Sequence, residues 1–300
     1  MVIAKRGDDA GFALLLVLVA LAVLSLVIAA TIDSARRYGD EAASKTESVR
    51  LRAGLDAAIA TAGRDLAEAD TGPPPLLSRP QTIVLDGIRV TVSLRPEASK
   101  IDLNASAPAL IAALLLASGL EAKFAQRLSD EIVDWRDGDS ETRPHGAKTA
   151  DYVLAGKSYG PPNHGFESVS ELALLRDGSG DLVDCLAPVL TVFTGRADID
   201  LSKASPKVRR AAAMVAPPPL GTGLLAASIV GGRVVQAGEL FEVDVAATSI
   251  ATGQSLSRRT ILRVTGDPRR PVWIVAQTSP VPRPAETTSA CERLRRARPD

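Results

Sequence analysis

The sequence predicts an α+β fold in which a long N-terminal helix packs on an antiparallel sheet, with a large α-helical insertion domain. Three observations support this fold class. Residues 12–30 form an uncharged apolar run that continues, without a proline, into an amphipathic stretch. Segments typical of strands lie on both sides of the middle of the chain. The middle itself has the apolar spacing of helices.

The composition argues against several function classes. The chain has 300 residues with 35 basic and 35 acidic side chains, so no overall field attracts nucleic acid. Aromatic residues make up only 3%, which argues against base-stacking platforms and sugar-binding clefts. Two histidines exclude a multi-histidine metal centre. Cys185 and Cys291 form no metal-spaced pair, and the sequence leaves open whether they form a disulfide or stay as thiols.

The apolar run Phe12–Ala30 has the length of a membrane-spanning helix, roughly 28 Å at about 1.5 Å per residue. Three interpretations compete: a secretory signal peptide cut after Ala29-Ala30, a plain membrane anchor, and a pilin-type helix. The helical pattern continues to Ala69, which favours the third. One face of this continuation repeats at steps of three or four, at Leu51, Leu55, Ile59, Ala62 and Leu66.

The residues around the start of the run resemble the processing site of type IV pilin-like proteins. A short leader with Lys5-Arg6 ends in Gly11, and Phe12 opens the run. The resemblance implies that residues 1–11 are a leader, that a prepilin peptidase cuts after Gly11 and methylates Phe12, and that residues 12–30 are the transmembrane helix. Most pilins carry glutamate at the fifth mature position, but here that position is Leu16. This departure resembles the K-type minor pseudopilin of the type II secretion system.

Strand signals follow the long helix. Asp86-Gly87 joins two runs rich in β-branched residues, 82–85 and 88–94, and predicts a β-hairpin. Alternating residues in 231–247 and 258–264, and an apolar run in 271–277, predict further antiparallel strands. We therefore expect a pilin-like helix and hairpin over residues 31–104 and a pilin-like sheet over residues 196–280. The Pro- and Arg-rich residues 281–300 predict a disordered tail.

Residues 105–195 predict the helical insertion domain. A weak repeat relates residues 100–108 to residues 198–206, and each copy leads through a proline into a helix. Within the insertion, residues 123–135 have the spacing of an amphipathic helix. An ordered series of short elements follows: Asp134-Trp135-Arg136-Asp137-Gly138-Asp139, Gly146-Ala147, Asp151-Tyr152, Tyr159, Asn163 and residues 166–172. This series resembles the α-helical domain peculiar to the K-type minor pseudopilin.

The same series contains a candidate metal site. Asp134, Asp137 and Asp139 lie at a helix end, where three close carboxylates repel one another unless water or a cation neutralises them. Calcium binds flexible sets of oxygen ligands, but the spacing is not that of an EF-hand, and a solvated acidic loop explains it equally well. The family's helical domain binds calcium, so the resemblance implies a Ca²⁺ site that also includes Asp151 and Asn163.

The resemblance implies an architectural function. The chain would be a minor pseudopilin at the tip of the type II secretion pseudopilus, initiating or capping assembly for protein export across the outer membrane. It would lie in the inner membrane as a single-pass protein with its C-terminal domain in the periplasm. Its implied partners are the other minor pseudopilins, the major pseudopilin, prepilin peptidase and the membrane. Leu16 has no carboxylate with which to neutralise the N-terminal amine of a neighbouring subunit. By the family resemblance, a subunit of this kind lies at the tip of the fibre.

Two alternatives stand beside this function, and catalysis is not expected. No nucleophile, base and orienting group can be named together, so we predict that the chain is not an enzyme. Residues 101–105 and the two following helices look like the start of a helix-hairpin-helix DNA-binding module on a membrane anchor. That hairpin offers one glycine, Gly119, and the helix after it mixes charges, so we expect no nucleic-acid partner. The second alternative is a generic membrane-anchored binding protein.

Overall fold

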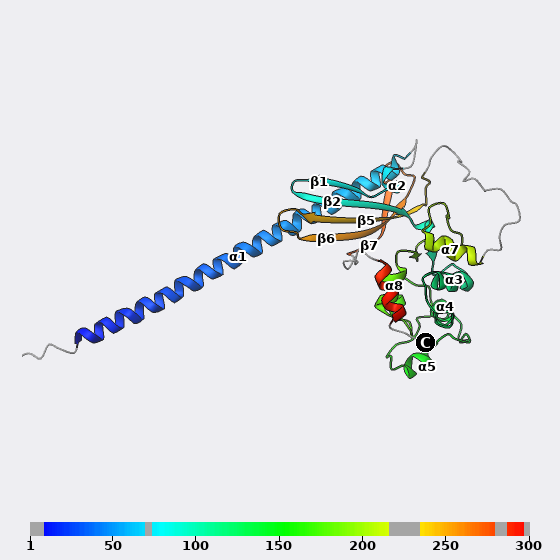
Figure 1. Cartoon of the computed structure of the whole chain (residues 1–300). Helices are drawn as coiled ribbons and strands as arrows, with labels where there is room; N and C mark the ends of the chain where they lie inside the picture. Colours follow the sequence, from blue (N-terminus) through cyan, green and yellow to red (C-terminus); the bar gives the residue numbers. More distant parts are fainter. Residues whose placement is uncertain (1–8, 70–73, 216–234, 280–286, 297–300) are drawn as a thin grey trace, which may run out of the picture.

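The computed structural model describes residues 9–69, 74–215, 235–279 and 287–296. Helix α1, Asp9–Ala67, is a single helix of 59 residues, as predicted, and its first part projects from the rest of the chain as a stalk (Figure 1). Its described side chains are exposed as far as residue 46. From there on one face is buried, at the five predicted positions Leu51, Leu55, Ile59, Ala62 and Leu66.

The second part of α1 packs on a five-stranded antiparallel sheet with strand order β1-β2-β5-β6-β7. The strands are β1 Gln81–Leu85, β2 Ile88–Pro96, β5 Leu240–Ser249, β6 Ser255–Val264 and β7 Val272–Thr278. The predicted hairpin joins β1 and β2, and Asp86 and Gly87 both have positive φ, at 48° and 74°, as a tight two-residue turn requires. A short helix, α2 (Pro75–Ser78), precedes β1.

A helical domain lies between β2 and β5 in the sequence and beside the sheet in space (Figure 1). Its α-helices are α3 Pro108–Ala117, α4 Ala122–Arg136, α5 Thr149–Leu154, α6 Gly180–Leu186, and α7 Pro206–Val215. Two 3₁₀ helices, η1 Glu97–Ser99 and η2 Val169–Ala173, and two short parallel strands, β3 Ile101–Asp102 and β4 Leu190–Thr191, complete it. Proline at the start of α3 and α7 suits a first helical turn, because the missing N–H would have no partner there.

Two predicted boundaries are corrected by the structure. The predicted disordered tail is wrong in its described part, because residues Thr287–Arg296 form helix α8, whose Ala290, Cys291 and Leu294 are buried in the helical core. The helical domain also extends beyond residue 195, because α7 packs on α3 and α8 packs on α6. Residues 231–234 of the predicted strand 231–247, and residues 281–286 and 297–300 of the tail, lie outside the described residues.

A buried network of charges joins the sheet to the helical domain. Glu242 of β5 accepts from Arg95 of β2 at 2.7 Å and from Lys100 at 2.9 Å, and Arg259 of β6 lies 3.0 Å from it. Lys100 also lies 2.5 Å from Glu97. Because Glu97, Lys100 and Glu242 are each less than 6% exposed, these charges depend on one another for neutralisation.

Candidate assembly helix and acidic loop

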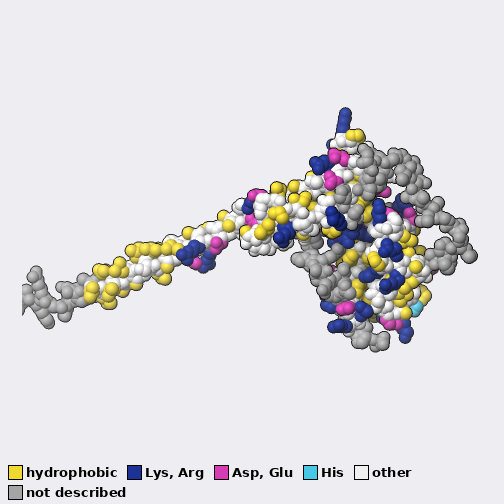
Figure 2. All heavy atoms as spheres, turned by 45° about the horizontal axis from the view of Figure 1, so that its top comes forward, with side chains coloured by type: hydrophobic (Ala, Val, Ile, Leu, Met, Phe, Trp, Pro, Cys, Tyr) yellow, Lys and Arg dark blue, Asp and Glu magenta, His cyan; other side chains and the backbone are white. Residues whose placement is uncertain are grey.

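The exposed part of α1 is the clearest candidate for an assembly surface. Figure 2 shows apolar side chains covering the outer part of the stalk, before the first cluster of charges. By length and composition, α1 is the one helix among the described residues able to cross a membrane. Its charged part begins with exposed ion pairs one turn apart, Asp33 with Arg37 and Glu41 with Lys45. The described side chains of the apolar part are exposed, so they are available to contact lipid or other helices.

The predicted processing residues lie near the start of this helix. Gly11 and Phe12 are in helical conformation, since α1 begins at Asp9, and Phe12 is exposed. Leu16 presents an exposed aliphatic side chain where most pilins have a carboxylate. Lys5 and Arg6 of the predicted leader lie outside the described residues. Cleavage and methylation stay predictions.

The acidic loop follows the end of α4. Asp134 lies in the last turn with its side chain fully buried, and its carboxylate accepts the N–H of Arg143 at 3.2 Å. Asp137, the residue that ends the helix, contacts the ammonium group of Lys148, and Asp139 Oδ1 lies 3.9 Å from the same nitrogen. Burial raises the pKa of Asp134, and the N–H of Arg143 opposes that shift.

The structure brings four of the five predicted calcium ligands around Lys148, a residue that the sequence reasoning missed. Besides Asp134, Asp137 and Asp139, the Asp151 carboxylate accepts the N–H of Lys148 at 2.9 Å. Asn163, which has positive φ, is not in contact with this group by any described hydrogen bond. The sequence gives no spacing pattern that marks this lysine, because its contacts with the end of α4 depend on the path of the loop in space.

The donor set in this arrangement does not fit a calcium ion. The carboxylates of Asp137 and Asp151 already bind Lys148, and that of Asp134 binds a main-chain N–H. Within the described ranges, no three His, Cys, Asp or Glu side chains are placed to hold a metal together. Calcium needs six to eight oxygen ligands, which this loop does not offer while Lys148 is in place. Calcium binding stays a prediction.

The remaining elements of the sequence series pack together as a scaffold beneath the loop. The ring of Trp135 lies 6.0 Å from that of Phe166 and 6.1 Å from that of Tyr152, and its indole N–H donates to Glu171 at 3.1 Å. The main chain of Phe166 exchanges two hydrogen bonds with the Asn104 side chain, at 2.7 and 2.9 Å. These contacts tie the end of α4 to the segments that follow the acidic loop.

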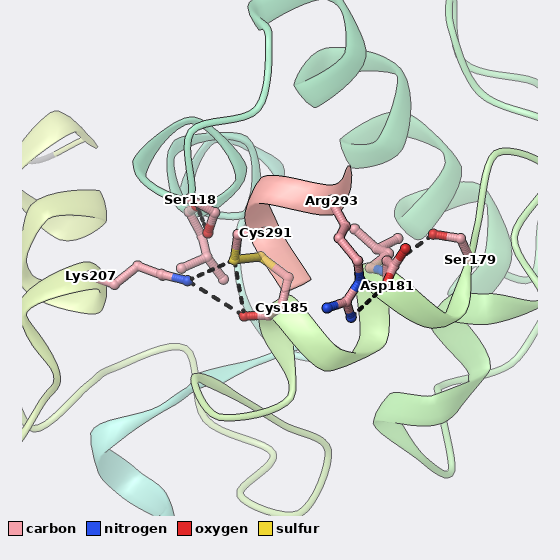
Figure 3. Close-up of a disulfide and its surroundings, with 9 residues drawn as sticks. Ser118, Ser179, Asp181, Cys185, Lys207, Cys291 and Arg293 are labelled. Carbon is pink, nitrogen blue, oxygen red and sulfur yellow. Dashed lines mark hydrogen bonds and ion pairs between the residues drawn. A yellow bond between two sulfur atoms is a disulfide. The ribbon is translucent and has the colours of Figure 1, made fainter. Parts of the chain in front are cut away.

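A disulfide fastens α8 to the helical domain. Cys185 of α6 and Cys291 of α8 are bonded, which decides the question that the sequence left open (Figure 3). The Lys207 ammonium lies 3.4 Å from both the carbonyl oxygen of Cys185 and Sγ of Cys291. Arg293 forms an ion pair with Asp181 at 2.7 Å. Structural disulfides of this kind persist in oxidising compartments.

Comparison with known proteins identifies the helical domain. Residues 92–195 match the family described as type II secretion system (T2SS), protein K. The helical domain of this chain is therefore similar to that of type II secretion system protein K. It is 31% identical over 93 residues to type II secretion system protein K of Pseudomonas aeruginosa, a stretch that covers 31% of this chain and 28% of that relative's length.

A solved structure shares the protein K fold. The crystal structure of the GspK-GspI-GspJ complex from the enterotoxigenic Escherichia coli type 2 secretion system contains a chain with a TM-score of 0.58 and 16% identity. The match covers 80% of this chain and 99% of that one. It confirms the predicted α+β fold of long helix, antiparallel sheet and helices. Protein K belongs to a secretion machine, which agrees with the expectation of a non-enzyme, and no comparison supports the DNA-binding alternative.

Proposed function

We propose that this chain is a minor pseudopilin at the tip of the type II secretion pseudopilus, where it initiates or caps assembly for protein export across the outer membrane. One observation carries this proposal. A protein K domain is inserted between two strands of a sheet that packs on an exposed apolar helix. The chain therefore combines a surface for joining other apolar helices with a bulky body beyond the sheet (Figure 1).

The tip position has a physical basis at Leu16. In a fibre of parallel helices, a buried carboxylate at this position would neutralise the N-terminal amine of a neighbouring subunit, and an aliphatic side chain cannot do so. The helical domain stands at the end of the sheet remote from the stalk, where it would obstruct a subunit stacked above it. Both features favour a subunit that other subunits join from one side.

The proposed partners are the I- and J-type minor pseudopilins of the same system, with the major pseudopilin below them. The similar solved structure is a complex of GspK with GspI and GspJ, and this chain offers an exposed apolar helix for contact with other subunits. We expect the full chain in detergent to co-purify with both partners. Deletion of residues 12–30 should abolish incorporation into fibres while the remainder stays folded. A truncated chain that still co-purifies with fibres would overturn the assembly role of α1.

Position within the fibre tests the tip proposal directly. Immunogold labelling of isolated pseudopili should find the chain at one end only. In a Leu16→Glu variant, which restores the carboxylate, label along the fibre as well would show that Leu16 rather than the helical domain confines the chain to the tip, and label at one end only would assign that role to the helical domain. Leu18→Glu is the matched control, because it places the same charge elsewhere on the helix and should not redistribute the label. Wild-type label spread along the fibre contradicts a cap.

We further propose that prepilin peptidase cleaves between Gly11 and Phe12 and methylates the new terminus. Mass spectrometry of the chain expressed with the peptidase should find a methylated N-terminus at Phe12, and expression without it should give the uncut chain. Gly11→Ala should block cleavage, whereas Gly39→Ala, in the exposed part of α1 with no atom near its Cβ, should not. A cut near Thr31 instead would indicate a signal peptide.

The proposed location is the inner membrane, with a single span and the C-terminal domain in the periplasm. The bond between Cys185 and Cys291 supports this orientation, because cytosolic reductants keep thiols reduced. Thiol labelling of the chain in intact cells tests it. We expect no labelling until a reductant is added, and labelling of both cysteines without reductant would place the domain in the cytoplasm.

A further inference from the structure

The C-terminal end of α4 concentrates negative charge. The last carbonyl groups of a helix lack intrahelical partners and carry the negative end of the helix dipole. Asp137 ends the helix with a carboxylate at this same place, and the Asp134 carboxylate is buried one turn earlier. Asp139 follows in the loop. A positive charge placed against such an end is stabilising.

Lys148 supplies that charge at the helix end, and the Arg143 guanidinium lies 3.8 Å from the Asp134 carboxylate. Its ammonium group donates to the carbonyl oxygen of Asp134 at 2.9 Å and contacts the Asp137 carboxylate, with Asp139 Oδ1 at 3.9 Å. Lys148 is 9% exposed, so solvent and salt screen these interactions less than they would screen a surface pair. One ammonium thus satisfies both a free helix carbonyl and the carboxylate at the helix end.

The position of Lys148 is set by its own backbone. Its N–H donates to Asp151 Oδ2 at 2.9 Å where α5 begins, and the preceding Ala147 is fully buried. Oδ2 of Asp151 therefore holds the main chain of Lys148 in position. From there the side chain of Lys148 reaches the end of α4.

We propose that Lys148 is the built-in counter-ion of the acidic loop and takes the place of a metal ion there. An ammonium group and a divalent cation would compete for the same oxygens of Asp134 and Asp137. With Lys148 in place, the helical domain is neutralised and folded without calcium. Assembly of this subunit is then indifferent to calcium, whatever its position in the fibre.

The test compares two lysines of the full chain purified in detergent. Lys148→Met removes the ammonium but keeps most of the volume, and Lys123→Met does the same at an exposed position on α4. In the presence of a calcium chelator, we expect the melting temperature of Lys148→Met to fall by about 5 °C or more, since the partly buried Asp137 carboxylate and the Asp134 carbonyl oxygen lose their partner. Lys123→Met should melt as the wild type does. Equal melting of the two variants would overturn the proposal.

Calcium titration separates a counter-ion from a metal site. Wild-type chain should show no calcium binding by calorimetry at millimolar concentration and no change in melting between calcium and chelator. Lys148→Met should gain a calcium-dependent rise in melting temperature, because its oxygens are now free. If the wild type binds calcium and is destabilised by the chelator, Lys148 does not replace the metal.

A double-mutant cycle tests the pairing of Lys148 with Asp137 independently of calcium, and rescue of folding in the double variant is its readout if Lys148→Met alone does not fold. Asp137→Asn removes the negative partner, so the double variant Asp137→Asn with Lys148→Met should melt higher than Lys148→Met alone. A double variant that loses the sum of the two single changes would show that the residues are not coupled, and would refute the proposed pairing.

Discussion

Gly146 lies directly against the side chain of Asp134. A Cβ at Gly146 would stand 2.7 Å from Cγ of Asp134 and closer still to its Oδ2. The carboxylate cannot move aside easily, because it is fully buried and accepts the N–H of Arg143 at 3.2 Å. The glycine is therefore a steric requirement of the acidic loop.

We expect Gly146→Ala to lower the free energy of unfolding by about 1–3 kcal/mol, the usual cost of forcing an extra methyl group into a packed site. Chemical denaturation of the full chain in detergent measures this change. Gly180→Ala is the matched control, because no atom lies within 4 Å of its Cβ and its φ is not positive. Comparable losses from both substitutions would show that the close approach at Gly146 is not the cause.

Replacing Cys185 and Cys291 with alanine should destabilise the helical domain by about 2–5 kcal/mol, because the disulfide closes a long loop and fastens α8. The bonded residues are 106 positions apart in the sequence. Limited proteolysis should then cut within α8 of the double variant but not of the oxidised wild type. A reductant should convert the wild type to the same behaviour and leave the variant unchanged. Resistance of the variant to proteolysis would mean that packing alone holds α8.

Glu242 should make the junction between sheet and helical domain sensitive to acid. Burial alone would raise the pKa of Glu242, but Lys100, Arg259 and Arg95 outweigh it and lower the pKa to about 2. Because the folded pKa lies below the ordinary value of 4.5, the stabilisation is fully present above pH 4.5 and is lost as the pH falls toward 2.

This shift in the pKa of Glu242 corresponds to about 3 kcal/mol of folding stability at neutral pH. Glu242→Gln should remove that stability at pH 7 and flatten the loss of stability between pH 4.5 and pH 2, as measured by denaturant unfolding at a series of pH values. Glu41→Gln is the control, since its partner Lys45 is exposed on the stalk and such pairs contribute little. An unchanged pH profile in Glu242→Gln would place the acid sensitivity elsewhere.

Leucine-to-alanine substitutions in the two halves of α1 should affect different properties: stability in the buried half, and insertion or assembly in the exposed half. Leu55→Ala should lower the free energy of unfolding by about 2–5 kcal/mol, because Leu55 is 2% exposed between α1 and the sheet. Leu24→Ala, at a position 55% exposed on the stalk, should leave unfolding unchanged and act only on insertion or assembly. Co-purification with partner subunits measures the second effect, and a stability loss in Leu24→Ala would contradict the division of the helix.

Local patterns predicted what depends on neighbours in the chain. The spacing of Leu51, Leu55 and Leu66 identified the buried face of α1, and Asp86-Gly87 identified the hairpin turn, since both are determined within a few residues. The order of the motif elements from Asp134 onward identified the helical domain. Helix α8 was missed because the Pro- and Arg-rich residues around it suggested disorder, and its helix is held by contacts made more than a hundred residues away.

The sequence alone predicted a membrane-length apolar helix, an antiparallel sheet and helices in the middle of the chain, because periodicity and turn chemistry are properties of short segments. The likeness of the helical domain to protein K came instead from the order of its short motifs. Only the tertiary structure decided that Cys185 bonds to Cys291 and that Lys148 lies against the end of α4. Each of these pairings depends on where a distant segment returns in space. The acidic loop shows the difference most clearly, since the carboxylates are visible in the sequence but the positive charge that neutralises them is placed by the fold.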